Sequence, residues 1–198
     1  MSPRVKNAAA TREAMLASAG RRFLQESYEN VGLRDIAGDA GVDVALVSRY
    51  FGSKEGLFRE VLRGSKGNWL EAGVTRETLP AWLACLATRN HTLQDDRQDL
   101  ERLLLILRSA SSPKAARIVH ESFRENVLTP VADLIDGEDP ELRASLALSL
   151  VIGSTILRTI MEVDAFSTCD AGPVRERLLN LFRTALADTP AERGGASA

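Results

Sequence analysis

Asp35 to Leu57 reads DIAGDAGVDVALVSRYFGSKEGL, and this stretch decides the fold. Two short apolar runs at helical spacing flank Gly41. Gly41 can adopt a positive φ at little cost and end the first helix, while Asp43 can cap the second by accepting a backbone N–H. Two short helices joined by a tight turn form a helix-turn-helix, whose second helix enters the major groove of DNA. The stretch therefore predicts DNA binding.

The residues around this stretch extend the helical pattern in both directions. We expect a helix from about residue 8 to residue 26, where apolar side chains recur every four positions. Tyr28 is expected to fill the core in the connection that follows, and Gly32 to begin the second helix. Ser53 is a good cap for a fourth helix. The predicted helix-turn-helix domain with its connecting helix spans residues 8–62.

The second half of the chain is predicted to be helical as well, because it contains no run of alternating β-branched residues. The expected helices are Leu79–Arg89, Asp95–Ser109, Pro113–Ile135, Pro140–Val163 and Pro173–Ala187. Ser112 and Asp139 precede two of these prolines and are expected caps. The fold class is therefore all-α, and we expect residues 1–7 to form a disordered basic arm and residues 188–198 a disordered tail.

Composition and charge limit the class of protein. With 198 residues, of which 44% are apolar, the chain can bury a sizeable core. No stretch approaches the ~20 consecutive apolar residues of a membrane span, and no apolar run follows Arg4 and Lys6, so we expect no membrane partner and no signal peptide. Two cysteines make no disulfide framework, which favours a reducing, cytoplasmic setting. The net charge is −2, but residues 1–25 hold five basic residues against one acidic residue, and this charge mildly favours nucleic acid at that end.

The order and spacing of several groups of residues resemble a known family. The matching groups are Phe23 and Tyr28, Asp35-Ile36-Ala37, Ala40-Gly41-Val42, Tyr50-Phe51, Ser53-Lys54-Glu55 and Leu57. On these residues, Thr11–Leu62 resembles the DNA-binding domain of the tetracycline-repressor (TetR) family of bacterial regulators. The chain departs from the family pattern at Val31, Gly32, Asp43, Ala45 and Ser48. The resemblance implies an N-terminal three-helix helix-turn-helix DNA-binding domain, followed at residues 63–187 by a C-terminal helical ligand-binding and dimerisation domain.

A recognition helix needs short side chains where it presses into the groove and a few long polar ones that reach base edges or phosphates. The expected DNA contacts are Arg34, Val44, Ala45, Ser48, Arg49, Tyr50 and Lys54. Arg49 suits a guanine edge or a phosphate, and Lys54 adds an ammonium at a helix start that already favours anions. Three positions have a plainer interpretation: Arg49 and Lys54 as solvated surface residues, and Tyr50 as a partly buried core aromatic. The basic residues Arg4, Lys6 and Arg12 are further candidates for the DNA backbone or minor groove.

The resemblance also implies partners beyond the double-stranded DNA operator. We expect a homodimer, since one helix reads few base pairs, with the dimer surface on residues 140–187. The expected dimer residues are Leu150, Ile156, Leu179 and Phe182. An unidentified small-molecule inducer is implied by the family, and its candidate lining is Trp69, Trp82, Cys85, His120, Phe123 and Arg124, with ordinary core packing as the alternative at each position.

An enzyme and a protein-binding adaptor are the alternatives to a regulator. His91 and His120 lack the spacing of zinc ligands, and the sequence contains no nucleophile elbow, Walker loop or dinucleotide fingerprint. We therefore expect no catalysis, no metal and no cofactor. A helical adaptor that binds only protein differs from a regulator in one measurable property, since only the regulator shows salt-dependent DNA binding. Repression rather than activation is the default of the family, held on analogy alone.

Overall fold

The computed structural model describes residues 3–64, 69–89, 101, 104–109, 112–167 and 172–188, with the side chains of those from residue 8 onward except residue 167. Every regular element within these ranges is helical, as the sequence predicts. The chain divides into two compact units: unit 1 comprises residues 1–69 and 91–126, and unit 2 comprises residues 70–90 and 127–198. Unit 1 is therefore built from two separate stretches of the sequence.

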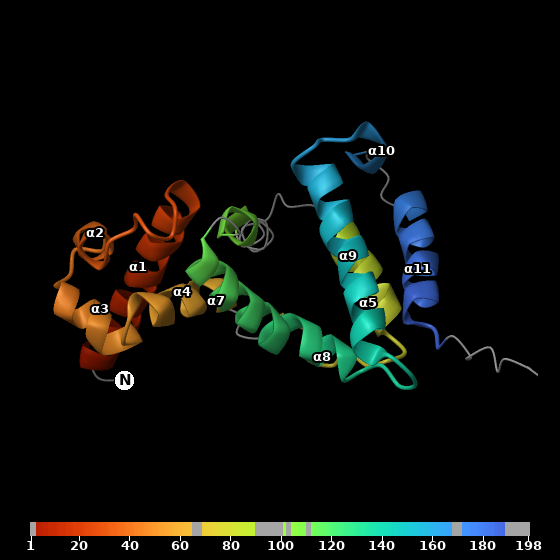
Figure 1. Ribbon diagram of the computed structural model, residues 1–198, viewed down its shortest axis with the longest axis horizontal. Helices are drawn as coiled ribbons and strands as arrows, with labels where there is room; N and C mark the ends of the chain where they lie inside the picture. Colours follow the sequence, from red (N-terminus) through yellow and green to blue (C-terminus); the bar gives the residue numbers. More distant parts are fainter. Residues whose placement is uncertain are drawn as a thin grey trace, which may run out of the picture. The chain divides into compact units, whose positions relative to one another are not determined.

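Four helices from the first stretch form the larger part of unit 1 (Figure 1). They are α1 (Pro3–Gln25), α2 (Leu33–Asp39), α3 (Val44–Phe51) and α4 (Lys54–Arg63). α1 begins at Pro3 rather than near residue 8, because proline suits the first helical turn and no helix-breaking residue follows it there. The basic arm expected at residues 1–7 is thus largely replaced by the first turns of this helix, and residues 1 and 2 lie outside the described residues.

The core of unit 1 forms beneath α3, around three aromatic rings. Phe23, Tyr28 and Phe58 pack with ring centroids 4.7 to 5.8 Å apart, and all three side chains are buried. Tyr28 fills the core as predicted, and burial raises the pKa of its hydroxyl to about 12. Ile36 and Val47 add the inward faces of the two short helices.

The second stretch of unit 1 completes this core. Residues 104–109 are helical, and α7 (Pro113–Phe123) packs against α4. Leu105, Ala115 and Ile118 are buried in the same apolar cluster as the aromatic rings. Ser112 caps α7 as predicted, because its hydroxyl accepts the N–H of Ala115 at 3.1 Å. The helix expected at residues 95–109 falls partly outside the described residues.

The single helix predicted over residues 113–135 is interrupted. After α7 the backbone forms a five-residue π-helix, η1 (Arg124–Leu128), and then the short helix α8 (Thr129–Ala132). Pro130 has no N–H for the bond to residue 126, which accounts for the break in the α-helical ladder. The side-chain amide of Asn126 donates to the carbonyl of Ser122 at 2.8 Å.

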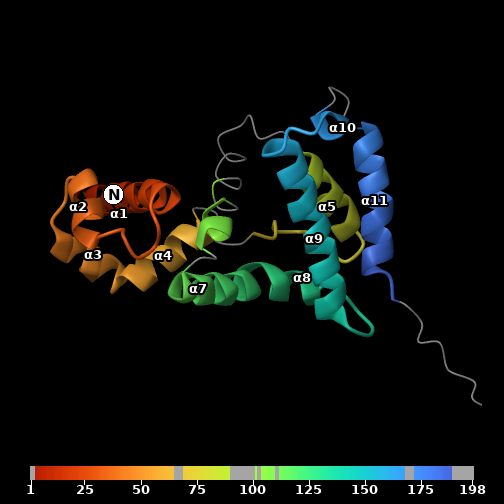
Figure 2. The ribbon, with the colours of Figure 1, turned by 45° about the horizontal axis from the view of Figure 1, so that its top comes forward.

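Unit 2 contains three helices that lie side by side in both views (Figures 1 and 2). They are α5 (Leu79–Thr88), α9 (Pro140–Thr159) and α11 (Gly172–Leu186), with the short α10 (Asp164–Ser167) preceding α11. Leu83, Leu148, Leu178 and Phe182 are buried between them. The predicted ranges agree with these helices, except that α9 ends at Thr159 and α10 was not predicted.

The start of α9 differs from the expected capping. Asp139 occupies the cap position in a left-handed conformation, with φ of 49°, and its side chain accepts no capping hydrogen bond. The buried Arg143 organises the preceding loop instead, because its guanidinium donates to the carbonyls of Asp136 and Glu138 at 2.7 and 3.0 Å. The same guanidinium bonds the carbonyl of Leu186 at the end of α11.

One face of α9 remains uncovered. Apolar residues occupy almost every side of this helix, and four of them, Leu142, Leu146, Leu157 and Ile160, are each 40% exposed or more. Among the described helices, α9 is the one with a length and composition that could cross a membrane, and a third of that window is buried inside the protein. The charged Glu141, Arg143 and Arg158 also lie on it.

Candidate nucleic-acid interface

The turn between α2 and α3 has the hydrogen bonds of a Schellman motif. Gly41 adopts a φ of +64° and donates its N–H to the carbonyl of Gly38 at 3.1 Å, while Val42 donates to the carbonyl of Ala37 at 3.0 Å. Asp43 then caps α3, because its carboxylate accepts the N–H of Ala45 at 2.7 Å. Both roles predicted from the sequence are confirmed, and together they fix the direction of α3.

The first helix of the pair is held against α1 by a polar contact. The Ser18 hydroxyl, fully buried, donates to the carbonyl of Ile36 at 3.1 Å. Arg22 donates to both carboxylate oxygens of Asp39 at 2.7 and 2.9 Å, and this pairing lowers the pKa of Asp39. The end of α2 is thereby fixed before the turn begins. Sequence reasoning missed this pair, whose members are 17 positions apart.

The third helix has one buried side and one open side. Val47 and Phe51 are buried, and Val47 is fully so. Ala45, Ser48 and Arg49 are exposed. Val44 is partly buried, and Tyr50 is 37% exposed with its ring 6.2 Å from that of Phe51. The open side thus presents short side chains with one guanidinium among them, which is what close approach to a groove requires.

Two of the expected DNA contacts are cations that make no ion pair within the described residues. Arg34, in the first turn of α2, and Arg49, in the last turn of α3, are both exposed. Within the described residues, neither guanidinium makes a salt bridge. Both charges therefore remain available to an external anion, unlike that of Arg22.

Lys54 differs from the other expected DNA contacts. Its ammonium lies 4.6 Å from the centroid of the Tyr28 ring and donates to the carbonyl of Glu29 at 3.2 Å. Burial lowers the pKa of this amine. In this structure Lys54 joins the start of α4 to the connection between α1 and α2, an internal role that neither sequence interpretation included.

Arg12 is also engaged inside the unit. Its guanidinium pairs with Glu60 on α4 and lies 5.4 Å from the centroid of the Phe51 ring. It therefore packs on the end of α3, whereas the side chains of Arg4 and Lys6 lie outside the described residues.

The junction between α3 and α4 depends on close backbone packing. Gly52 adopts a φ of +73°, and Ser53 caps α4 by accepting the N–H of Gly56 at 3.1 Å, as predicted. A Cβ added at Gly56 would overlap the carbonyl oxygen of Phe51. This position was missed by the sequence analysis, because a requirement for glycine between two helices has no periodic signature.

Two ion pairs join α4 to α7. Lys114 pairs with Glu55, and Arg59 pairs with Glu121 at 2.6 Å. The Lys114 ammonium is the main reason that the pKa of Glu55 falls to about 2. α4, the helix that follows α3, is therefore held by a segment some sixty residues further along the chain.

The six candidate ligand residues are divided between the two units. Trp69, His120, Phe123 and Arg124 belong to unit 1, and Trp82 and Cys85 belong to unit 2. His120, Arg124 and Cys85 are exposed, and the other three are partly buried. Two cavities described in the structure, one in each unit, are lined by other residues.

The expected dimer residues also separate into two kinds. Leu150, Ile156 and Leu179 are partly exposed on α9 and α11. Phe182 is fully buried inside unit 2, so its predicted place at a dimer surface is wrong for this conformation. The strongly exposed apolar residue of α11 is its neighbour Leu181.

The described residues contain no group of three or more His, Cys, Asp or Glu side chains placed to hold a metal ion. His120 is exposed on α7, while His91 and Asp95 lie outside the described ranges.

Comparison with family models identifies both halves of the chain. Residues 15–61 match the model described as bacterial regulatory proteins, tetR family. Residues 83–186 match the model described as tetracyclin repressor-like, C-terminal domain. The second match covers more than half of the chain.

Individual relatives agree with these models. The chain is 31% identical over 121 residues to the HTH-type transcriptional regulator BetI of Agrobacterium fabrum, a match covering 60% of this chain and 44% of that protein. The aligned part thus spans less than half of that relative.

Solved structures are similar in fold. NalD of Pseudomonas aeruginosa, the secondary repressor of the MexAB-OprM multidrug efflux pump, is 20% identical with a TM-score of 0.63, covering 92% of this chain and 98% of its own. GusR of Salmonella enterica is 16% identical with a TM-score of 0.57, covering 89% and 95%. At these identities the likeness concerns the fold alone.

Proposed function

The chain belongs to the tetR family of bacterial regulatory proteins, and we propose that it is a sequence-specific DNA-binding regulator of transcription. We propose further that the protein is a cytoplasmic homodimer that represses transcription, and that a small-molecule ligand releases it from a double-stranded operator. The observation that supports this proposal is the open side of α3. There Ala45 and Ser48 allow close approach, and Arg49 can donate two hydrogen bonds to a guanine edge.

The contacts have different roles in this proposal. Arg49 reads a base, and Arg34 at the start of α2 neutralises a phosphate. Tyr50 donates its hydroxyl to the backbone, while Val44 and Ala45 touch a thymine methyl group. Lys54 contributes chiefly through the Tyr28 ring and the Glu29 carbonyl, by fixing the start of α4.

The second copy is expected to cover the open face of α9. Leu142, Leu146, Leu157 and Ile160 repeat at spacings typical of packed helices, and a Cβ added at Gly153 would meet no heavy atom within 4 Å. Leu181 extends the apolar surface onto α11. Two copies joined by these helices would present two recognition helices to two half-sites, about 34–36 Å apart for dimers of this kind.

The DNA proposal is tested by fluorescence anisotropy of a labelled mixed-sequence duplex at several salt concentrations. Wild type is expected to bind, with affinity falling steeply as salt rises, and Arg34→Ala is expected to reduce that slope by about 1. Arg117→Ala, an exposed arginine of α7 in the same unit, is the matched control and should keep the slope. Binding that is absent, or that does not respond to salt, would instead favour the adaptor alternative.

A further inference from the structure

The last turn of α3 carries Arg49, the side chain proposed to read a base, and ends at Phe51. A helix of eight residues is too short to be stable alone, so contacts with the rest of unit 1 fix its direction. The turn at Gly41 and the Asp43 cap hold its first end. The contacts of the last turn therefore decide where the backbone of Arg49 lies.

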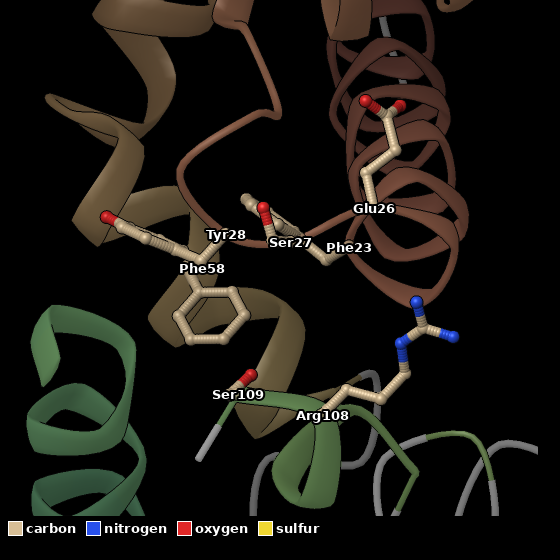
Figure 3. A pocket seen from close by; sticks show the side chains of 7 residues that line it. All are labelled: Phe23, Glu26, Ser27, Tyr28, Phe58, Arg108 and Ser109. Atoms are coloured by element: carbon tan, nitrogen blue, oxygen red, sulfur yellow. The ribbon is translucent and has the colours of Figure 1, made fainter. Parts of the chain in front are cut away.

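Phe51 anchors this last turn, and the ring of this buried residue has a contact of its own. The rings of Phe23, Tyr28 and Phe58 pack on one another in the core (Figure 3). Within the described residues, no ring pair joins Phe51 to these three. The guanidinium of Arg12 on α1 lies over the Phe51 ring instead, with its central carbon 5.4 Å from the ring centroid.

The same guanidinium also contacts α4, because Arg12 pairs with Glu60. One side chain of α1 therefore contacts both the end of α3 and the helix that follows it. Both members of the ion pair are partly exposed, so the pair adds little to the stability of the whole unit. A phosphate from outside would have to compete with the Glu60 carboxylate for this cation. The geometry therefore favours an internal role for Arg12.

We propose that Arg12 is a positioning residue for DNA recognition. Its guanidinium holds the Phe51 ring and so keeps the last turn of α3 in the place from which Arg49 reaches a base edge. Glu60 acts through Arg12, by fixing the guanidinium over the ring. A bidentate contact with guanine needs both donors in place, whereas phosphate contacts tolerate small shifts. Loss of Arg12 should therefore weaken specific binding more than non-specific binding. This role rests on the proposed function.

Glu60→Gln distinguishes this role from a direct contact between Arg12 and DNA. The substitution removes a negative charge and releases the Arg12 guanidinium, so a direct phosphate contact would become stronger in the variant. The positioning role predicts the opposite: binding to a duplex that wild type selects from a random library weakens, and the preference over a mixed-sequence duplex falls. Glu13→Gln removes an exposed carboxylate from α1 and is the matched control. It should bind the selected duplex at least as tightly as wild type. Tighter specific binding by Glu60→Gln would overturn the proposal.

A double-mutant cycle tests whether Arg12 acts through Arg49. Arg12→Ala should raise the dissociation constant of the selected duplex about fivefold or more in wild type, but less than about twofold in Arg49→Ala, because the dependent base contact is then already missing. All variants are compared at a temperature where circular dichroism shows them folded. An equal rise in both backgrounds, or a salt slope reduced by about 1 as after loss of a phosphate contact, would contradict the positioning role.

Amide hydrogen exchange in the DNA-free protein tests the contact without relying on the proposed function. The N–H of Gly52 donates to the carbonyl of Ser48 at 2.8 Å and closes the last turn of α3, and the N–H of Ala40 closes the end of α2 in the same way on Ile36. Arg12→Ala should speed exchange at Gly52 about fivefold, as expected for loss of one exposed cation–π contact and ion pair, and leave Ala40 within about twofold of wild type.

Equal acceleration at both amides, or none at Gly52, would show that Arg12 does not hold this turn. If exchange at Gly52 responds as expected and no duplex binds at all, the proposed function fails together with the DNA role of Arg12, while its hold on α3 stands.

Discussion

At the scale of single residues, Lys54 shows why a motif position does not determine a contact. The sequence places a lysine at a helix start, where a phosphate is the natural partner. In the folded unit its ammonium already has the Tyr28 ring and the carbonyl of Glu29, which lies 25 positions away. Such a contact depends on how the connection between α1 and α2 folds back towards α4. The residues next to Lys54 in the sequence do not predict that path.

Glu55 gives a prediction that depends on pH. Its folded-state pKa of about 2 lies below the ordinary value of 4.5, so ionisation of this carboxylate stabilises the folded state above pH 4.5. The stabilisation is lost as the pH falls from 4.5 towards 2. The free energy of unfolding of Glu55→Gln, measured in urea at several pH values, should therefore be lower than that of wild type at pH 7, and this difference should shrink on acidification.

Glu13→Gln supplies the background effect of removing an exposed carboxylate from α1 in the same unit. A difference between Glu55→Gln and wild type that stays constant from pH 7 to pH 3, as a purely steric change would give, contradicts the role of the Lys114 pair. The effect should be modest, because both partners are partly exposed.

At the scale of secondary structure, the start and end signals of the short helices were readable from the sequence. Gly41, Asp43 and Ser53 act as predicted because each role needs only backbone groups two to four residues away. The need for a glycine at position 56 could not be predicted from the sequence, because it arises where α3 and α4 approach each other. The π-helix η1 had a signal in Pro130, whose missing N–H the sequence analysis did not use.

Gly56→Ala should destabilise the protein by about 1–3 kcal/mol, because the new methyl group overlaps the backbone of Phe51 and forces α4 away from α3. The measurement is equilibrium unfolding in urea, followed by circular dichroism at 222 nm.

Gly38→Ala is the matched control. Gly38 lies inside α2 and its added Cβ would meet no heavy atom within 4 Å, so alanine there should stabilise by about 0.4–1 kcal/mol. Equal effects of the two substitutions would show that the junction between α3 and α4 is looser than described.

At the scale of the whole molecule, the sequence predicted helices but not which of them pack together. Ala115 and Ile118 have the spacing of an apolar helix face, yet that spacing does not say that they join the core of Phe23 and Phe58. Likewise Phe182 and Leu181 are adjacent apolar residues on α11, and only the packed unit shows which one is buried. The spacing of apolar residues predicts which face of a helix is buried. It does not predict which helix, far away in the sequence, packs against that face.

The open face of α9 gives the prediction at this scale. Leu146→Glu should convert a dimer to a monomer in sedimentation velocity, because a charge would be buried without a partner between the two copies. Leu107→Glu is matched in chemistry and exposure, with Leu107 at 48% and Leu146 at 49%, and lies in unit 1. It should remain a dimer. A monomeric wild type, or equal loss of dimer in both variants, would remove α9 as the interface.

We propose that the open side of α3 reads DNA through Arg49. The most direct test is selection of bound sequences from a random duplex library, performed in parallel with wild type and Arg49→Ala. Wild type should enrich an inverted repeat whose half-sites lie one helical turn or a multiple apart, and Arg49→Ala should relax the preference at one guanine per half-site while costing about 1–3 kcal/mol in affinity. No enriched sequence with wild type, or the same sequence with undiminished preference in the variant, would contradict the account.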